Sequence, residues 1–433
     1  MSGKRADKAK NKKADRGNAG AEDDPSKTTD DYQCCGNVEI DFPRLCALLG
    51  MNDIPAVKNS KSKINAMTLW RKPCLCAELE SEDPCSVKSI KIFGWKVDEL
   101  IAQVLNKMLP SLSKLQSLQL WQARLSDRMI ISLKNTVCVC ANLRSVILEG
   151  NPLPEQSYHL LLSEDSVLAQ LSLRHNQMGD EGARLIGSAL STPTSANKNL
   201  MSLNLAFNSI GDAGAAYIAQ GLRLNRALLL LSLSNNRIGD TGAAHLAKTL
   251  GEFALTHEEI IARRKLLLEK DQTASMTLGS VSLQDTPKKD EKPAANPAGG
   301  TGKKEDPKTN KKYTDMPCAA SLPCHHQTGL VEIESPLLDP AVQHRDGQVI
   351  LPGNTALAYL NLSGNRITKQ LLPLLLTILQ TQPEGQGLRR LCLQVCYSQH
   401  THVSCVYGRV GHTHTNTHTQ NMNPNCVIRV QAI

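Results

Sequence analysis

The sequence contains few aromatic residues. Its 433 residues include 3 Trp, 7 Tyr and 4 Phe, which is 3% of the chain. Aromatic side chains bury large areas and dominate the cores that contain them, so a single core built on rings is disfavoured. Leucine supplies much of the apolar content instead. We therefore expect many similar small cores stacked along the chain.

Long apolar runs are also missing. The sequence has no stretch of 18 consecutive apolar residues, so no membrane-spanning helix is predicted. The first residues, MSGKRADKAKNKKADRGNAGAEDD, include no apolar stretch of signal-peptide length. We therefore expect a cytoplasmic or nuclear protein whose 14 cysteines are reduced thiols and form no disulfide framework.

The part of the chain outside its tails and insertion is not strongly basic either, although the formal net charge of the whole chain is +8. Residues 1–30 carry +2, residues 271–316 carry +1 and residues 397–433 carry +2, which leaves +3 for the body. This charge is too small for a basic stripe, so no nucleic-acid partner is predicted. A nuclear address or a polyanion-binding arm is an alternative reading of the lysine-rich start, but its composition favours a disordered tail over residues 1–31.

A leucine-rich pattern recurs along the body. The template L-x-x-L-x-L-x-x-N-x-L fits five segments, and each has an asparagine in register. They start at Leu143, Leu168, Leu200, Leu228 and Leu357, and their asparagines are Asn151, Asn176, Asn208, Asn236 and Asn365. Two weaker copies start at Val87 and Leu115, and a broken one starts at Leu388. Several starts are 28 residues apart, which indicates one structural unit per repeat.

Each repeat predicts a strand, a turn and a helix. Alternating apolar residues make a short strand, and the asparagine amide closes the turn by satisfying backbone groups. A Gly-Asp pair follows in three repeats, with Asp180, Asp212 and Asp240 at the expected helix N-cap. Apolar helical stripes come next. The predicted fold class is therefore α/β: a leucine-rich repeat solenoid (horseshoe) with an inner parallel sheet and outer helices, plus disordered tails and an insertion.

The remaining chain is arranged around this array. A solenoid needs a cover for its first repeat, and the N-terminal region next to the repeats is expected to supply it. A capping-box pattern at Thr256 and Glu259 predicts a helix to about Lys270, followed by a disordered linker. The predicted order is a tail over 1–31, a cap over 32–86, repeats over 87–255, an insertion over 256–356, repeats over 357–396 and an irregular low-complexity tail over 397–433.

The chain resembles ribonuclease-inhibitor-like leucine-rich repeat proteins. The resemblance rests on the repeats and on segments that a generic repeat does not require, among them LEGNPLPEQSYH (Leu148–His159) and LTHEEIIARRKLLLEK (Leu255–Lys270). It covers about Tyr32 to Leu393, and the tail beyond departs from the family. The resemblance implies a repeat protein with no established catalytic residue.

Motifs for chemistry are weak. The segment Gly299–Lys303 lacks the first glycine of a phosphate-binding loop, since Pro297 stands there. Cys318, Cys324, His325 and His326 form a poorly spaced group for zinc, and a chance cluster is favoured. We therefore predict no catalytic residue, no metal and no cofactor.

One face of the predicted sheet is the candidate binding site. Residues between the inward leucines point away from the core, because side chains alternate along a strand. Most are small and polar, but Phe93, Trp121 and Ile147 fall in three successive repeats, and Glu149 and Arg174 add charge. We predict that these five residues bind a protein partner. The alternative is that the N-terminal cap folds over the two rings.

The predicted function is a non-enzymatic scaffold that binds a protein partner on the concave face of the repeats. The first alternative is a structural subunit of a ciliary, axonemal or cytoskeletal assembly, which implies a ciliary or flagellar location. The second is a GTPase-activator-like regulator, which needs an exposed arginine near the nucleotide. Arg174 is the candidate for that role.

Overall fold

The structure is a computed structural model that describes residues 29–60, 73–163, 165–279, 335–382, 386–397, 401–405 and 430–432. The chain divides into two compact units. Unit 1 comprises the chain up to Ile186 together with Asn199–Gly211 and Leu230–Arg237. Unit 2 comprises Gly187–Lys198, Asp212–Leu229 and the chain from Ile238 onward. The possible zinc group and most of the predicted disordered linker lie outside the described residues. The first part of that linker, residues 271–279, is helical, so the prediction of disorder is wrong there.

Unit 1 contains a sheet whose strands follow the order of the sequence. All neighbouring pairs are parallel except the second and third strands, which run antiparallel. The strands are β1 (Ala56–Ser60), β2 (Cys74–Leu79), β3 (Val87–Phe93), β4 (Ser117–Trp121), β5 (Ser145–Ile147), β6 (Gln170–Ser172), β7 (Ser202–Asn204) and β8 (Leu230–Ser232). The six strands from β3 to β8 are the predicted repeat strands.

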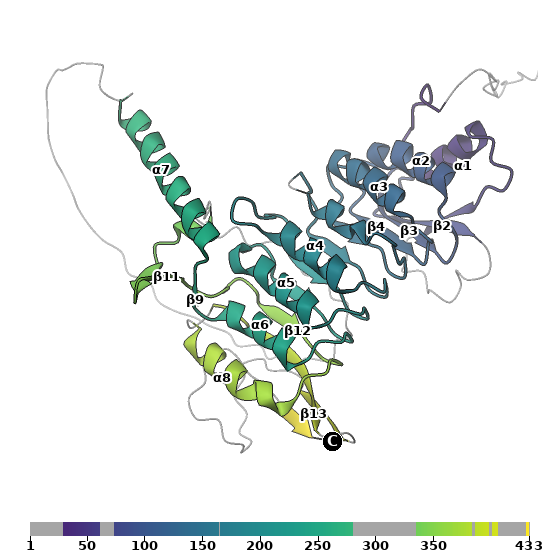
Figure 1. The fold of residues 1–433 in the computed structure, drawn as a ribbon. Coiled ribbons are helices and arrows are strands. Elements are labelled where there is room, and N and C mark those ends of the chain that lie inside the picture. Colours follow the sequence, from purple (N-terminus) through teal and green to yellow (C-terminus); the bar gives the residue numbers. More distant parts are fainter. Residues whose placement is uncertain are drawn as a thin grey trace, which may run out of the picture. The chain divides into compact units, whose positions relative to one another are not determined.

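Helices alternate with these strands. Figure 1 shows α1, α2 and α3 along one side of β2, β3 and β4. The repeat that starts at Leu143 has a 3-10 helix, η3 (Ser157–Leu162), where the repeats on either side of it have an α-helix. The α-helices are α1 (Val38–Leu48), α2 (Glu99–Met108), α3 (Asp127–Val139) and α4 (Asp180–Leu190), the last of which begins in unit 1 and ends in unit 2.

Unit 2 contains the remaining helices and two groups of strands. Its α-helices are α5 (Asp212–Leu224), α6 (Asp240–Leu250), α7 (His257–Gly279) and α8 (Leu372–Thr381). A three-stranded antiparallel sheet consists of β9 (Phe253–Ala254), β10 (Gln343–Arg345) and β11 (Gln348–Leu351). The repeat strand β12 (Tyr359–Asn361) pairs in parallel with β13 (Arg390–Tyr397).

The repeat pattern resumes directly after the insertion. Asn365 Oδ1 accepts a hydrogen bond from the backbone N–H of Ile238, 127 residues earlier, at 3.1 Å. The N–H groups of Ala358 and Tyr359 both donate to the carbonyl of Leu229 at 2.9 Å. Because these are the contacts that neighbouring repeats make elsewhere, the repeat that begins at Leu357 packs on the one that precedes the insertion.

The aspartates of the Gly-Asp pairs make contacts other than the predicted helix N-caps. Asp180, Asp212 and Asp240 are the first residues of their helices, and the N-cap of α6 is Gly239. The prediction that these aspartates act as N-caps is therefore wrong. Each carboxylate instead accepts an N–H from the next repeat: Asp180 from Gly211 at 2.6 Å, Asp212 from Gly239 at 2.6 Å and Asp240 from Thr368 at 2.7 Å. The aspartates therefore join successive repeats.

The predicted helix of the insertion is α7, which runs to Gly279 and so is longer than expected. It extends away from β9 and β11 (Figure 1). Its base packs on a small core of Leu224, Leu255, Leu337 and Leu351. The capping box is present, since Glu259 accepts from the N–H of Thr256 at 2.8 Å and Thr256 Oγ1 accepts from the N–H of Glu259 at 3.2 Å.

An ion pair fixes α7 at this base. Arg223 donates from Nε and Nη2 to the two Glu259 oxygens at 2.9 and 2.6 Å, and its guanidinium lies over the Phe253 ring at 4.0 Å. The Glu259 side chain is only 6% exposed. Burial alone would raise the pKa of Glu259, but hydrogen bonds from Arg223 and Thr256 outweigh burial and lower this pKa below its usual value.

We expect acid to release α7. A carboxylate whose pKa is lower in the folded state stabilises that state above the usual glutamate range, near pH 4, and stops doing so as the pH falls through the lowered value. Glu259→Ala should therefore cost about 2–3 kcal/mol at pH 7, because it leaves the Arg223 guanidinium without its buried partner. Hydrogen-exchange protection of residues 260–266 measures the effect. Glu258→Gln, on the exposed neighbour, is the control, and equal losses in the two variants would contradict this account.

Part of the tail beyond residue 396 forms strands. β13 continues to Tyr397 and pairs antiparallel with β14 (Thr401–Cys405), which pairs with β15 (Val430–Ala432). These residues belong to the segment predicted to be irregular, and a His/Thr composition gives no alternating apolar signal that would reveal them. The nine cysteines whose side chains are described form no disulfide with one another.

Candidate protein-binding face

The repeat strands of unit 1 have one apolar and one polar side. Inward leucines such as Leu171, Leu203 and Leu231 are at most 1% exposed. Side chains at the alternate positions form the polar face, and most of them are half-buried. In strand order the polar face comprises Ser89, Lys91, Phe93, Ser117, Gln119, Trp121, Ser145, Ile147, Glu149, Gln170, Ser172, Arg174, Ser202, Asn204, Ala206, Leu230, Ser232 and Ser234.

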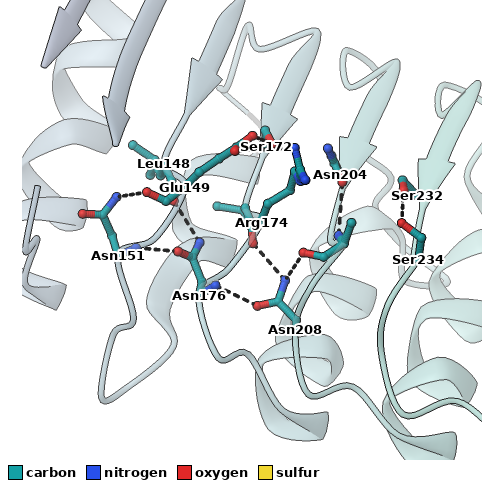
Figure 2. A network of polar contacts seen from close by, with 12 residues as sticks. Leu148, Glu149, Asn151, Ser172, Arg174, Asn176, Asn204, Asn208, Ser232 and Ser234 are labelled. Carbon is teal, nitrogen blue, oxygen red and sulfur yellow. Dashed lines mark hydrogen bonds and ion pairs between the residues drawn. The ribbon is translucent and has the colours of Figure 1, made fainter. Parts of the chain in front are cut away.

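Buried asparagines close the turns that follow the strands (Figure 2). Asn176 Oδ1 accepts from the N–H of Asn151 at 2.7 Å, and Asn208 Oδ1 accepts from the N–H of Asn176 at 3.0 Å. Their Nδ2 groups donate back to carbonyls of the preceding repeat, Leu148 and Leu173, at 2.9 Å. Asn236 and Asn365 extend the same pattern within their own units. This ladder positions the ends of the strands and therefore the polar face.

The two predicted charged residues of the polar face lie together (Figure 2). Ser172 Oγ donates to Glu149 Oε1 at 2.6 Å, and Arg174 Nη1 lies 3.9 Å from Glu149 Oε2. The Glu149 side chain is 14% exposed and that of Arg174 is 35% exposed. The carboxylate is thus held by its neighbours, while part of the guanidinium remains accessible.

The two predicted aromatic residues also meet. Phe93 and Trp121 are in register on β3 and β4, with ring centroids 5.3 Å apart and planes tilted by 41°. Phe93 also packs against Cys74 and Cys76 of β2, so the N-terminal region does contact one of the rings. Both residues are half-buried, and Trp121 Nε1 is buried without a hydrogen-bond partner among the described residues.

Ile147 does not join the aromatic pair as the third member of a row. It is in register with Gln119, not with Trp121, and its next neighbour is Ser172. Glu149 is instead the residue level with Trp121, since the Glu149 carbonyl accepts from the N–H of Gln122 at 2.8 Å. The polar face therefore contains a pair of aromatic residues followed by an ion pair.

Trp121 can be tested by two substitutions. Trp121→Ala is expected to cost about 2 kcal/mol, less than the 3–5 kcal/mol of a fully buried tryptophan, because its ring is only half-buried. Trp121→Phe keeps a ring against Phe93 and removes the unpaired N–H, so its stability should be unchanged or higher. Urea unfolding of both variants measures these two changes in stability. A loss in Trp121→Phe as large as that in Trp121→Ala would show that the indole N–H has a partner.

Two residues of this region were missed by the sequence reasoning. Phe207 is 40% exposed, and its ring stacks on that of His175 with centroids 4.5 Å apart. The Arg174 guanidinium lies 5.0 Å from the centre of the same ring. His175 and Phe207 both occupy the turn position just before a ladder asparagine. This position lies outside the alternating strand positions from which the binding face was predicted.

Among the described residues, no three His, Cys, Asp or Glu side chains are grouped closely enough to hold a metal ion. In the same part of the chain, the helices are too short or too polar to cross a bilayer.

A comparison with known families agrees with the observed repeats. A family model described as leucine rich repeat matches residues 166–187, 196–219 and 225–247. These matches contain the repeats that start at Leu168, Leu200 and Leu228. The chain therefore contains leucine-rich repeats, and the predicted fold class of an α/β repeat solenoid is confirmed.

Proposed function

We propose that this leucine-rich repeat chain is a non-enzymatic scaffold that binds a protein partner through the polar face of unit 1. Leucine-rich repeats commonly serve as protein-interaction modules, because stacked repeats present an extended surface of side chains. The observation that supports the proposal is the contrast between the two sides of the repeat strands. One side is closed by leucines, and the other presents an aromatic pair, an ion pair and small polar groups.

The composition of the polar face suits protein recognition. Aromatic residues and arginine carry most of the binding energy at interfaces, while small polar neighbours contribute complementarity. Trp121 at the end of β4 and Arg174 in the turn after β6 supply such groups, and the asparagine ladder holds the backbone of these turns in place. Side chains on such supports lose little freedom on binding, which favours affinity.

Site-specific photo-crosslinking tests the proposal. A photoreactive amino acid at Gln170, an exposed position of the polar face, should crosslink a protein partner in cells. The same group at Val139, which is 66% exposed on α3, is the matched control and should not. Equal crosslinking at both positions, or crosslinking at Val139 alone, would place the partner elsewhere.

A structural role in a cytoskeletal or ciliary assembly is the second candidate. The observation that favours it is α7, which exposes Ile261 to 52%, Leu267 to 39% and Leu268 to 63%. Exposed apolar side chains on one projecting helix are suited to contact with a neighbouring subunit. Cofractionation with axonemes that depends on Leu268 would support this role over the first.

We do not propose the GTPase-activator role. That role requires an arginine at a bound nucleotide, and the contacts of Arg174, with Glu149 and the Phe207 ring, give no observation that favours it. The closer kinship that we do propose is to leucine-rich repeat-containing protein 71. It is supported only by the similar segments outside the generic repeat, such as HRDGQVILPGN (His344–Asn354).

A further inference from the structure

One turn position adopts the same unusual backbone conformation in every full repeat. The residue just before each ladder asparagine has a positive φ: 71° at Gly150, 57° at His175, 57° at Phe207, 54° at Asn235 and 71° at Gly364. Glycine reaches this left-handed region freely, and asparagine reaches it more easily than most residues. Gly150, Gly364 and Asn235 therefore suit the position.

Phe207 suits the position least, because histidine, like asparagine, is enriched in this region whereas a bulky aromatic residue is not. A bulky side chain in the left-handed region is strained, and such strain is concentrated at functional sites. Phe207 gains no buried core in return, because it is 40% exposed. Its described contacts are the rings and charge of its neighbours, His175 at 4.5 Å and Arg174 at 5.0 Å. The left-handed turn therefore places the Phe207 ring at the surface at a cost in backbone strain.

The strand and turn segments around this ring carry a net positive charge, and Glu149 beside Arg174 is an acidic neighbour. The strand and turn segments 170–178, 202–210 and 230–237 contain two arginines, Arg174 and Arg237, one histidine and no acidic residue. Arg237 is exposed on the turn after β8. Glu149 of the preceding repeat already accepts from Ser172 and faces Arg174, and Asp180 and Asp212 accept N–H groups of the following repeat. A partner with carboxylates would complement this surface.

We propose that Phe207, His175 and Arg174 form the anchor point for an acidic segment of a partner protein that places an apolar side chain on the Phe207 ring. The inference rests on the proposed function and deepens it by naming the partner's chemistry. The apolar side chain covers the exposed part of the ring, and the carboxylates of the segment pair with the accessible part of Arg174 and with Arg237. Binding should weaken as salt increases, because both arginines are at least partly exposed.

The test combines binding and stability. Short random peptides displayed on phage are selected on the full-length protein, and the selected peptides are then measured against variants. We expect peptides with Asp or Glu next to a large apolar residue. Phe207→Asn, which copies Asn235 of the next repeat, should reduce their affinity about tenfold or more. The melting temperature of this variant should stay equal or increase, because asparagine relieves the strain.

Two further variants make the result specific. Arg174→Gln should weaken the same peptides, whereas Tyr217→Gln, on an aromatic residue of matched exposure (41%) on α5, should not. The inference is overturned if Phe207→Asn keeps full binding, if it lowers the melting temperature, or if no selected peptide depends on Phe207. Peptides that depend on Trp121 but not on Phe207 would leave the proposed function intact and refute this inference alone.

Discussion

Gly221→Val is expected to disrupt the packing of α5 on α4 and to lower the free energy of unfolding by about 3 kcal/mol or more. A Cβ atom at Gly221 would lie 2.2 Å from the carbonyl oxygen of Gly187, and one at Gly187 would lie 2.3 Å from that of Tyr217. Both obstacles are backbone atoms, so no side chain can move away. Replacing a helix glycine usually gains about 1 kcal/mol. Here the overlap of two helix backbones outweighs that gain, since overpacking costs about 1–3 kcal/mol even where the neighbours can shift.

Thermal and urea unfolding of matched variants measures this cost. Gly221→Ala should already be destabilising, and Gly221→Val more so. Gly179→Ala is the control: its added Cβ would meet no atom within 4 Å, so its stability should hardly change. If Gly221→Ala were as stable as the native chain, the close approach of α4 and α5 would be wrong.

Asn208→Ala is expected to cost about 3–5 kcal/mol, more than most single substitutions. Asn208 Oδ1 accepts from the N–H groups of Asn176 and Met178, both at 3.0 Å. Its Nδ2 donates to the carbonyls of Leu173 and Leu205 at 2.9 and 3.0 Å. An alanine leaves these buried backbone groups unsatisfied, and each such group costs about 1–3 kcal/mol.

Hydrogen exchange at the amides of Asn176 and Met178 gives a local measurement beside the melting temperature. Both amides should lose protection in Asn208→Ala. Asn208→Asp keeps the acceptor oxygens but brings a negative charge to two carbonyl oxygens, so it should be no better. The control is Asn204→Ala, because the Asn204 side chain accepts only from the nearby N–H of Ala206 among its described bonds, at 3.1 Å. Similar losses in Asn204→Ala and Asn208→Ala would argue against the ladder.

The repeat strands could be predicted because their signal is dense. Inward leucines at alternate positions and an asparagine in register admit one arrangement, and Leu171, Leu203 and Leu231 are buried as expected. The tertiary partners of the aspartates could not be predicted. Asp212 is conspicuous in the sequence, but a shift of one residue decides whether its carboxylate caps its own helix or reaches the following repeat.

The candidate site was predictable to a similar extent. Alternation placed Phe93 and Trp121 on one side of the strands, and the structure brings them together. Alternation does not give the level of each residue along neighbouring strands, which is why Ile147 aligns with Gln119. Phe207 lies beyond the alternating pattern, in a turn. Only a comparison of that turn position between repeats, with glycine in two of them, would have drawn attention to it.

The hydrogen bond between Ile238 and Asn365 has a consequence during synthesis. The ribosome adds about 5–20 residues per second, so the 127 residues between these partners take roughly 6–25 s. Local helix and hairpin formation needs only microseconds. The repeat that ends in α6 can therefore fold long before the next repeat is synthesised. During that time the Ile238 N–H and the Asp240 carboxylate lack their native partners. In that interval the unfinished end of the array is open to pairing with another chain that has an exposed strand edge.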